Sequence, residues 1–227
     1  MIKTGLNNNQ LKLIAMLTMT VDHVGILLLP QWAVLRLIGR LALPIYGYMI
    51  AEGCRHTSGM PKYLGSIAGM ALVCQVVYWV ALGSLYQCIL VTFSLSVALI
   101  WLVKLAMTKK TPALWVAVAA AVAAVFVITQ VLPQVLRGTD FAVDYGFFGV
   151  LLPVVIYLAD TKPRKLLAAA GMLSLIALDA WQGQWAALLA LPLLWLYNGR
   201  RGKMNLKWIF YFYYPVHLLV IQGISML

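Results

Sequence analysis

The sequence predicts an all-α, polytopic membrane protein with about nine transmembrane helices in one domain, residues 1–227. Composition is the first observation behind this prediction: 63% of the residues are hydrophobic and only 10% are charged, and the mean hydropathy is +0.91. Such a composition does not suit a water-soluble surface. The second observation is that the apolar residues fall into runs of the length that a helix needs to cross a bilayer, about 20 residues.

The apolar runs and the charges between them predict the topology. The runs cover residues 11–30, 32–52, 62–82, 86–107, 112–134, 146–160, 165–181, 184–198 and 207–226. Lysine and arginine precede the first run and follow the second, fourth, sixth and eighth, whereas the connections after the first, third and seventh runs carry none. Positive residues favour the cytoplasmic side, so we expect a cytoplasmic N-terminus and, with nine spans, an external C-terminus.

The excess of basic residues has the same explanation. The chain has 17 Lys and Arg against 6 Asp and Glu, a formal charge of +11. In a soluble protein this charge would suggest binding to nucleic acid. Here the cations lie between membrane spans, so we expect the lipid bilayer to be the partner and expect no nucleic acid. Cys54, Cys74 and Cys88 lack metal-binding spacing, and we expect neither a metal site nor a disulfide framework.

Ionisable side chains inside the spans mark the candidate site, because each costs at least roughly 2.5 kcal/mol at bilayer depth. They are Asp22, His23, Arg36, Arg40 and His217. His23 lies about 16 Å along its helix from Lys12, and His217 about 15 Å from Lys207, so both histidines reach the middle of the membrane and can share one site.

Spacing predicts how these groups pair. Arg36 and Arg40 are one helical turn apart at the depth of Asp22, so an ion pair between Asp22 and an arginine is expected. Adjacent side chains diverge by about 100 degrees on a helix, so Asp22 and His23 need not touch and no triad is predicted. In the simplest alternative, these groups only satisfy one another and fix helix register.

Two further polar groups lie at the ends of spans. Glu52 and His56 are four residues apart at the predicted cytoplasmic end of the second span. They either form a cluster that contacts a soluble ligand or are the ordinary charged end of a helix. Asp140 and Asp144 lie in a predicted outer loop, where they either favour a cationic group such as an amine or are simply solvated.

Four stretches, taken in order and spacing, resemble the TraX family over nearly the whole chain. They are Asp22-His23-Val24-Gly25; Arg36 to Ile45 followed by Glu52-Gly53 and His56-Thr57; Asp144-Tyr145-Gly146; and Leu191-Pro192 through Asn198-Gly199-Arg200-Arg201-Gly202 to Tyr214-Pro215-Val216-His217-Leu218. This family takes its name from a conjugation protein linked to N-terminal acetylation of pilin. It looks related to integral-membrane acyl-CoA acyltransferases, which use a histidine in their first span.

The resemblance implies a multi-pass acetyltransferase of the bacterial inner membrane. Acetyl-CoA would be its co-substrate, and the acceptor an amine or hydroxyl of a pilin or another extracytoplasmic or membrane molecule. His23 would be the catalytic base, acting with Asp22 and Arg40. The residues implied in substrate binding are Arg36, Glu52, His56, Asp144, Tyr145 and His217.

Three other functions use the same residue types. Mid-membrane His, Asp and Arg also occur in small-molecule transporters and proton-coupled permeases. Two histidines at matching depth can be axial ligands of a haem. A membrane assembly factor without chemistry would use the polar groups only to hold helices together.

Overall fold

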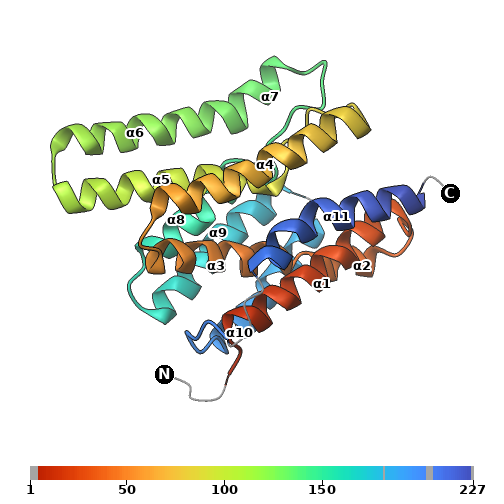
Figure 1. The fold of residues 1–227 in the computed structure, drawn as a ribbon, viewed down its shortest axis with the longest axis horizontal. Helices are drawn as coiled ribbons and strands as arrows, with labels where there is room; N and C mark the ends of the chain where they lie inside the picture. Colours follow the sequence, from red (N-terminus) through yellow and green to blue (C-terminus); the bar gives the residue numbers. More distant parts are fainter. Residues whose placement is uncertain (1–4, 181, 203–206, 226–227) are drawn as a thin grey trace. The chain divides into compact units, whose positions relative to one another are not determined.

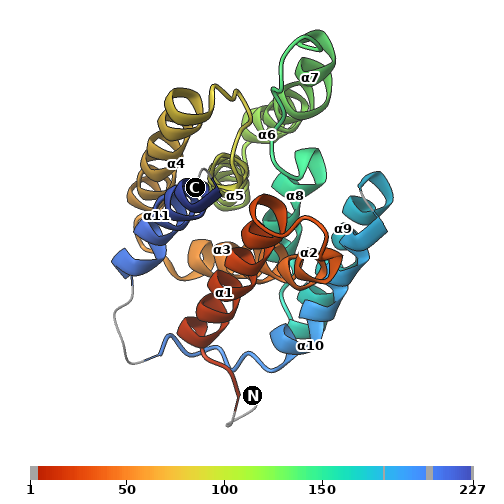
Figure 2. The ribbon, with the colours of Figure 1, turned by 90° about the vertical axis from the view of Figure 1, so that its right-hand side faces the viewer.

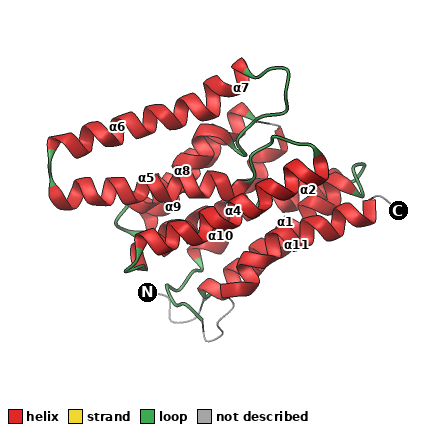
Figure 3. Cartoon of the chain, turned by 45° about the horizontal axis from the view of Figure 1, so that its top comes forward, coloured by secondary structure: helices red, strands yellow, loops and turns green. Residues whose placement is uncertain are grey.

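The computed structural model describes residues 5–180, 182–202 and 207–225 (Figure 1). Every regular element in this described part is a helix (Figure 3), and extended backbone pairs only in two isolated bridges, Leu6 with Tyr197 and Gln87 with Val143. The all-α prediction is confirmed.

Helix lengths support a membrane protein. By length and composition, five helical segments can cross a bilayer: Asn8–Leu27, Ala33–His56, Met60–Val80, Ile89–Lys109 and Pro112–Val135. Gly146–Leu158 and Gly183–Trp195 are shorter apolar helices. Nine spans and a cytoplasmic N-terminus stay predictions.

The chain divides into two compact units, which are described separately. The first unit is Met1–Met49 with Ala159–Leu227, and the second is Ile50–Leu158. The first contains α1 (Asn8–Leu27), α2 (Ala33–Gly39), the start of α3 (Ala42–His56), α9 (Lys162–Asp179), η2 (Gln182–Leu189), α10 (Ala190–Trp195) and α11 (Lys207–Ser225).

In the first unit, α1 is the central element. It begins at a capping box, in which the Asn7 side chain accepts from the Gln10 amide at 3.0 Å and the Gln10 side chain accepts from the Asn7 amide at 2.9 Å. One side of α1 packs against α2 and another against α11, as Figure 2 shows. The 3₁₀ helix η2 packs against α9 and α2 and so closes the far side of α2.

The second predicted span, 32–52, is not one uninterrupted helix. It breaks between α2 and α3, at Arg40 and Leu41. Pro44 explains the break, because it has no amide hydrogen to donate to the carbonyl of Arg40 four residues earlier. The break places Arg40 at the end of α2, where its amide still bonds the carbonyl of Arg36 at 3.2 Å.

The second unit is built on α5 (Ile89–Lys109), which packs against α4 (Met60–Leu82), α6 (Pro112–Phe126) and α8 (Gly146–Leu158). Helix α4 ends at Gly83, whose φ of +61° favours glycine. The π-helical turn η1 (Val127–Val131) and α7 (Leu132–Val135) continue α6. Pro133 leaves the carbonyl of Thr129 without its usual amide partner, which accounts for the wider turn.

Candidate functional site

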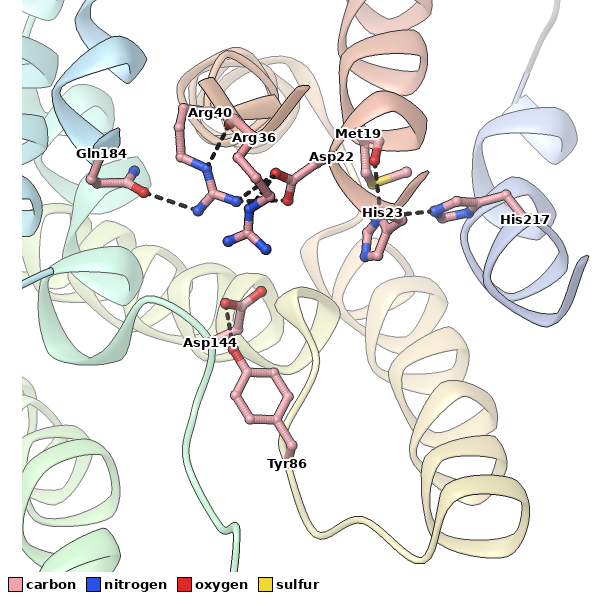
Figure 4. A network of polar contacts seen from close by, with 9 residues as sticks. All are labelled: Met19, Asp22, His23, Arg36, Arg40, Tyr86, Asp144, Gln184 and His217. Carbon is pink, nitrogen blue, oxygen red and sulfur yellow. Dashed lines mark hydrogen bonds and ion pairs between the residues drawn. The ribbon is translucent and has the colours of Figure 1, made fainter. Parts of the chain in front are cut away.

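An ion-paired cluster joins α1 to α2 in the first unit. Arg40 Nη2 donates to both carboxylate oxygens of Asp22, at 2.7 Å each, and Arg36 Nε lies 3.3 Å from Asp22 Oδ1 (Figure 4). The predicted ion pair between Asp22 and an arginine is therefore confirmed, with both arginines engaged. Side-chain exposure is 12% for Asp22 and 10% for Arg40, so the pair is shielded from solvent.

The guanidinium of Arg40 is held on three sides. Besides Asp22, its Nη1 donates to Gln184 Oε1 at 3.0 Å, and its Nε donates to the backbone carbonyl of Arg36 at 3.3 Å. Arg36 is the more exposed of the two arginines, with 31% of its side chain accessible. Arg40 is thus fixed within the cluster, whereas Arg36 lies at its more exposed edge.

Gln184 was not among the predicted site residues. It comes from η2, it is 2% exposed, and its Nε2 is a buried donor with no hydrogen-bond partner among the described residues. The only sequence signal was a polar residue in the aromatic stretch 181–185, which reads as an interfacial connection. Its contact with Arg40 depends on η2 packing against α2, and no local pattern reveals that.

Glycine brings α1 and α2 close enough for this cluster. A Cβ on Gly39 would overlap the side chain of Asp22, and a Cβ on Gly25 would lie 2.8 Å from Leu35 Cβ. The two helices therefore meet at small residues, as is usual for helices packed in a membrane.

The two histidines meet on the other side of α1. His217 Nε2 lies 3.3 Å from His23 Nδ1, and the ring centroids are 5.0 Å apart. This contact confirms that the two histidines lie together; their depth in the membrane stays a prediction. No gap for an iron porphyrin is left between these two nitrogens, so the geometry argues against a haem held between the rings.

Backbone carbonyls determine the tautomers of both rings. His23 Nδ1 lies 2.9 Å from the carbonyl of Met19, and His217 Nδ1 lies 2.8 Å from the carbonyl of Tyr213. Since a carbonyl only accepts, each Nδ1 carries the proton in the neutral ring. His23 Nε2 then keeps its lone pair, and no described residue donates a hydrogen bond to it.

Helix α11 is attached to α1 beside this pair. The ring of Tyr213 stacks on His217, with centroids 4.9 Å apart and planes inclined by 12°. Its hydroxyl forms a short hydrogen bond with Thr20 Oγ1. Neither Thr20 nor Tyr213 was a predicted site residue; both support the histidine pair from the flanks.

Asp22 and His23 serve different neighbours. Figure 4 shows Asp22 directed to the arginines and His23 directed to α11. The carboxylate therefore does not hydrogen-bond the imidazole, in agreement with the expected divergence of adjacent side chains.

The remaining predicted residues lie in the second unit. Glu52 is 7% exposed, and its carboxylate lies 3.9 Å from Arg55 Nε and 3.9 Å from His56 Nδ1. His56 itself is exposed and its Nδ1 bonds the carbonyl of Glu52 at 2.8 Å. This group has the features of a charged helix end, since it closes the last turn of α3.

Asp144 and Tyr145 lie where the loop after α7 enters α8. Tyr86 donates to Asp144 Oδ1 at 2.7 Å, and Thr92 donates to the Asp144 carbonyl at 2.7 Å. Tyr145 has a φ of +57°, a left-handed conformation that a non-glycine residue seldom adopts. Asp140 accepts from the Ser84 hydroxyl at 2.5 Å and the Leu85 amide at 2.9 Å.

These loop acids tie two connections together. The hydrogen bonds from Ser84 and Leu85 hold the pKa of Asp140 below its usual value. Burial, with the charge of Asp144 beside it, raises the pKa of the Tyr86 hydroxyl, which therefore stays a donor. In the described part of the chain, no three His, Cys, Asp or Glu side chains are grouped closely enough to hold a metal ion.

A model of the TraX protein family matches residues 7–225. The chain belongs to the TraX family. It is 28% identical to the probable fimbrial assembly protein FimC, serogroup H1, of Dichelobacter nodosus, over 96% of this chain and 95% of that protein. A shorter stretch, 36 residues, is 44% identical to an uncharacterized protein of Rickettsia prowazekii (strain Madrid E), covering 16% of this chain and 14% of the other. No solved structure matches.

Membership of the TraX family and the apolar helices lead to the same conclusion about where the chain resides. The chain is a membrane protein, with most of its length in apolar helices. The family match covers α1, α2 and α11 together, and these are the elements that carry the ion-paired cluster and the histidine pair.

Proposed function

We propose that this TraX family member is an inner-membrane, multi-pass acetyltransferase that uses acetyl-CoA. The acetyl group would pass to an amine or hydroxyl of an extracytoplasmic or membrane acceptor. The observation that carries the proposal is the histidine pair: His23 presents an imidazole with a protonated Nδ1 and an unprotonated Nε2, inside a membrane helix. An imidazole in that state is a ready general base.

His23 would act on the acceptor. Its Nε2 removes the proton as the acceptor nitrogen or oxygen attacks the thioester carbonyl, which becomes a tetrahedral oxyanion. Collapse breaks the carbon–sulfur bond, and the leaving thiolate takes the proton back from His23 as CoA departs. The carbonyl of Met19 would hold this tautomer, and His217 Nε2 lies 3.3 Å from the same His23 Nδ1.

An arginine would stabilise the oxyanion. Arg36 is the better donor for this role because it is the more exposed, whereas Arg40 is held by Asp22 and Gln184 and would position Arg36 through their shared carboxylate. A charged donor aimed at developing negative charge is the usual main source of rate enhancement in acyl transfer. Substrate-binding roles for Glu52, His56, Asp144 and Tyr145, which lie in the second unit, stay predictions.

The relative from Dichelobacter nodosus bears on the acceptor. Its name refers to fimbrial assembly, and fimbriae consist of protein subunits displayed outside the cell. We therefore favour a pilin-type subunit or another cell-surface molecule as the acceptor.

Release of CoA from acetyl-CoA by the purified protein in detergent tests the proposal. We expect slow release by the parent protein and none above background by a His23→Ala variant that elutes as a folded protein in size exclusion. If acetyl-CoA neither turns over nor raises the melting temperature, the proposal is wrong. Substrate-dependent flux in proteoliposomes without acetyl-CoA would then support a transporter.

A further inference from the structure

Two segments far apart in the sequence meet at the start of α1. The Leu6 amide donates to the carbonyl of Leu196 at 2.9 Å, and the Asn198 amide returns a bond of 2.9 Å to the carbonyl of Leu6. The Asn8 amide donates to the carbonyl of Arg200 at 2.8 Å. These bonds fix the first turn of α1 beside the segment 196–201.

Cations gather at this junction. Lys12 lies on the second turn of α1, and the first turn of α1 is bonded to Arg200, the residue before Arg201. Lys162 Nζ, at the start of α9, donates to the carbonyl of Tyr197 at 2.7 Å and also to the carbonyl of Trp195. Three elements that are distant in the chain therefore bring positive charge to one end of the first unit.

Tyr197 connects a further lysine to the group. Its ring meets the ring of Tyr48 edge to face, with centroids 5.9 Å apart. Lys165 Nζ lies 5.8 Å from the centroid of the same Tyr48 ring, and the lysine is 9% exposed. We call Lys12, Lys162, Lys165, Arg200 and Arg201 the basic end.

The acidic side chains of the first unit either form ion pairs or lie far from the basic end. Asp22 bonds Arg40 in the ion-paired cluster, Asp160 bonds Arg164 at 3.0 Å, and Asp179 is the last residue of α9, the opposite end from Lys162. The basic end thus concentrates positive charge, and such a concentration raises the local density of anions.

We propose that the basic end binds the phosphate groups of the acyl donor's nucleotide. This inference rests on the proposed function. Arginine matches phosphate with paired hydrogen bonds, and lysine adds point charge. Lys12 and His23 lie about 16 Å apart along α1, a distance that an extended pantetheine arm covers. The thioester would then reach His23 while the nucleotide stays at the basic end.

The test compares two thioesters that share the arm and differ in the nucleotide. Kinetics are measured with acetyl-CoA and with S-acetylpantetheine, for the parent, for Arg201→Gln and for the double variant Lys12→Gln with Arg201→Gln. Arg201 is exposed, so its single variant is not expected to disturb folding. The control is Arg137→Gln, which removes an exposed loop cation that bonds Gln134.

We expect the KM for acetyl-CoA to rise about tenfold in Arg201→Gln, equivalent to about 1.4 kcal/mol, and further in the double variant. The kcat/KM for S-acetylpantetheine should stay within about twofold of the parent, and Arg137→Gln should change neither. Equal losses with both thioesters, or no loss with acetyl-CoA, would overturn the inference.

Binding of CoA itself separates this inference from the proposed function. If the parent binds CoA without turnover and the double variant does not, the phosphate site stands and the acetyltransferase proposal fails. The same anion chemistry occurs in lipid headgroups, so the titration is repeated in nanodiscs with and without phosphatidylglycerol. Loss of phosphatidylglycerol binding in the double variant, with CoA affinity unchanged, would show a lipid site and contradict the proposal.

Discussion

Asp22 presents both carboxylate oxygens to one nitrogen of Arg40, at 2.7 Å each, inside a membrane helix pair. The next residue, His23, points to a different side of α1 and contacts His217. One turn of helix therefore supplies an ion pair to one neighbour and an imidazole to another. This division predicts that loss of Asp22 harms stability before it harms chemistry.

Asp22→Ala should lower the free energy of unfolding by about 3 to 5 kcal/mol, because it leaves a shielded guanidinium without its carboxylate. Chemical denaturation in detergent measures this. Asp160→Ala is the control. Both side chains of the Asp160–Arg164 pair are exposed, so the loss of this pair should leave the unfolding transition unchanged. Equal stability of Asp22→Ala and the parent would show that the ion pair contributes nothing.

Gly39→Ala tests the close approach of α1 and α2. The added methyl would overlap the side chain of Asp22, so either the helices separate or the carboxylate turns away from Arg40. We expect a loss of about 1 to 3 kcal/mol in stability, measured by thermal unfolding. Gly65→Ala in α4 is the matched control, since open space surrounds its Cβ and a helical alanine stabilises by roughly 0.5 to 1 kcal/mol. Two equally tolerated alanines would argue against tight packing at Gly39.

Gln184→Met should cost about 1.5 to 3 kcal/mol, the usual value of a hydrogen bond to a charged group. The substitution keeps the length of the side chain and removes the acceptor for Arg40 Nη1. Denaturation curves of the parent and the variant measure the difference. A more stable variant would mean that the cost of the buried Nε2 outweighs the bond to Arg40.

The stability of the loop that contains Asp140 should depend on pH. Its folded pKa lies below the ordinary value, so its contribution to stability is complete above the unfolded pKa and is lost as the pH falls through the folded pKa. The protection of the Leu85 amide against hydrogen exchange, taken relative to the intrinsic exchange rate at each pH, should therefore fall on acidification below the ordinary pKa of aspartate. In Asp140→Asn the exchange should lack this acid step, and an unchanged step would assign it to another group.

The helices could be predicted from the sequence because the apolar residues that mark each of them are contiguous in the chain. Each predicted apolar run is mostly helical in the described residues, although the run 32–52 is divided between α2 and α3 and the run 184–198 between η2 and α10. The ionisable residues within the runs identified both the ion pair and the histidine pair. The divergence of the adjacent side chains of Asp22 and His23 followed from the helical repeat alone.

Other features depend on contacts between distant segments. Pro44 explains the break at Arg40. Prolines also occur near the starts of ordinary helices, so Pro44 alone did not predict this break. Gln184 reaches Arg40 only because η2 packs on α2, and the basic end forms only where segment 196–201 pairs with the first turn of α1. Composition and periodicity carry no information on either contact.

His23 Nε2 is the proposed base for acyl transfer. The formation of acetohydroxamate from acetyl-CoA tests this role most directly. Hydroxylamine serves as a small surrogate acceptor, and the purified parent is compared with folded His23→Ala. The rate above the uncatalysed reaction should fall by roughly 10² to 10⁴ in the variant, the usual share of a general base. Equal rates in the two proteins would contradict a catalytic His23.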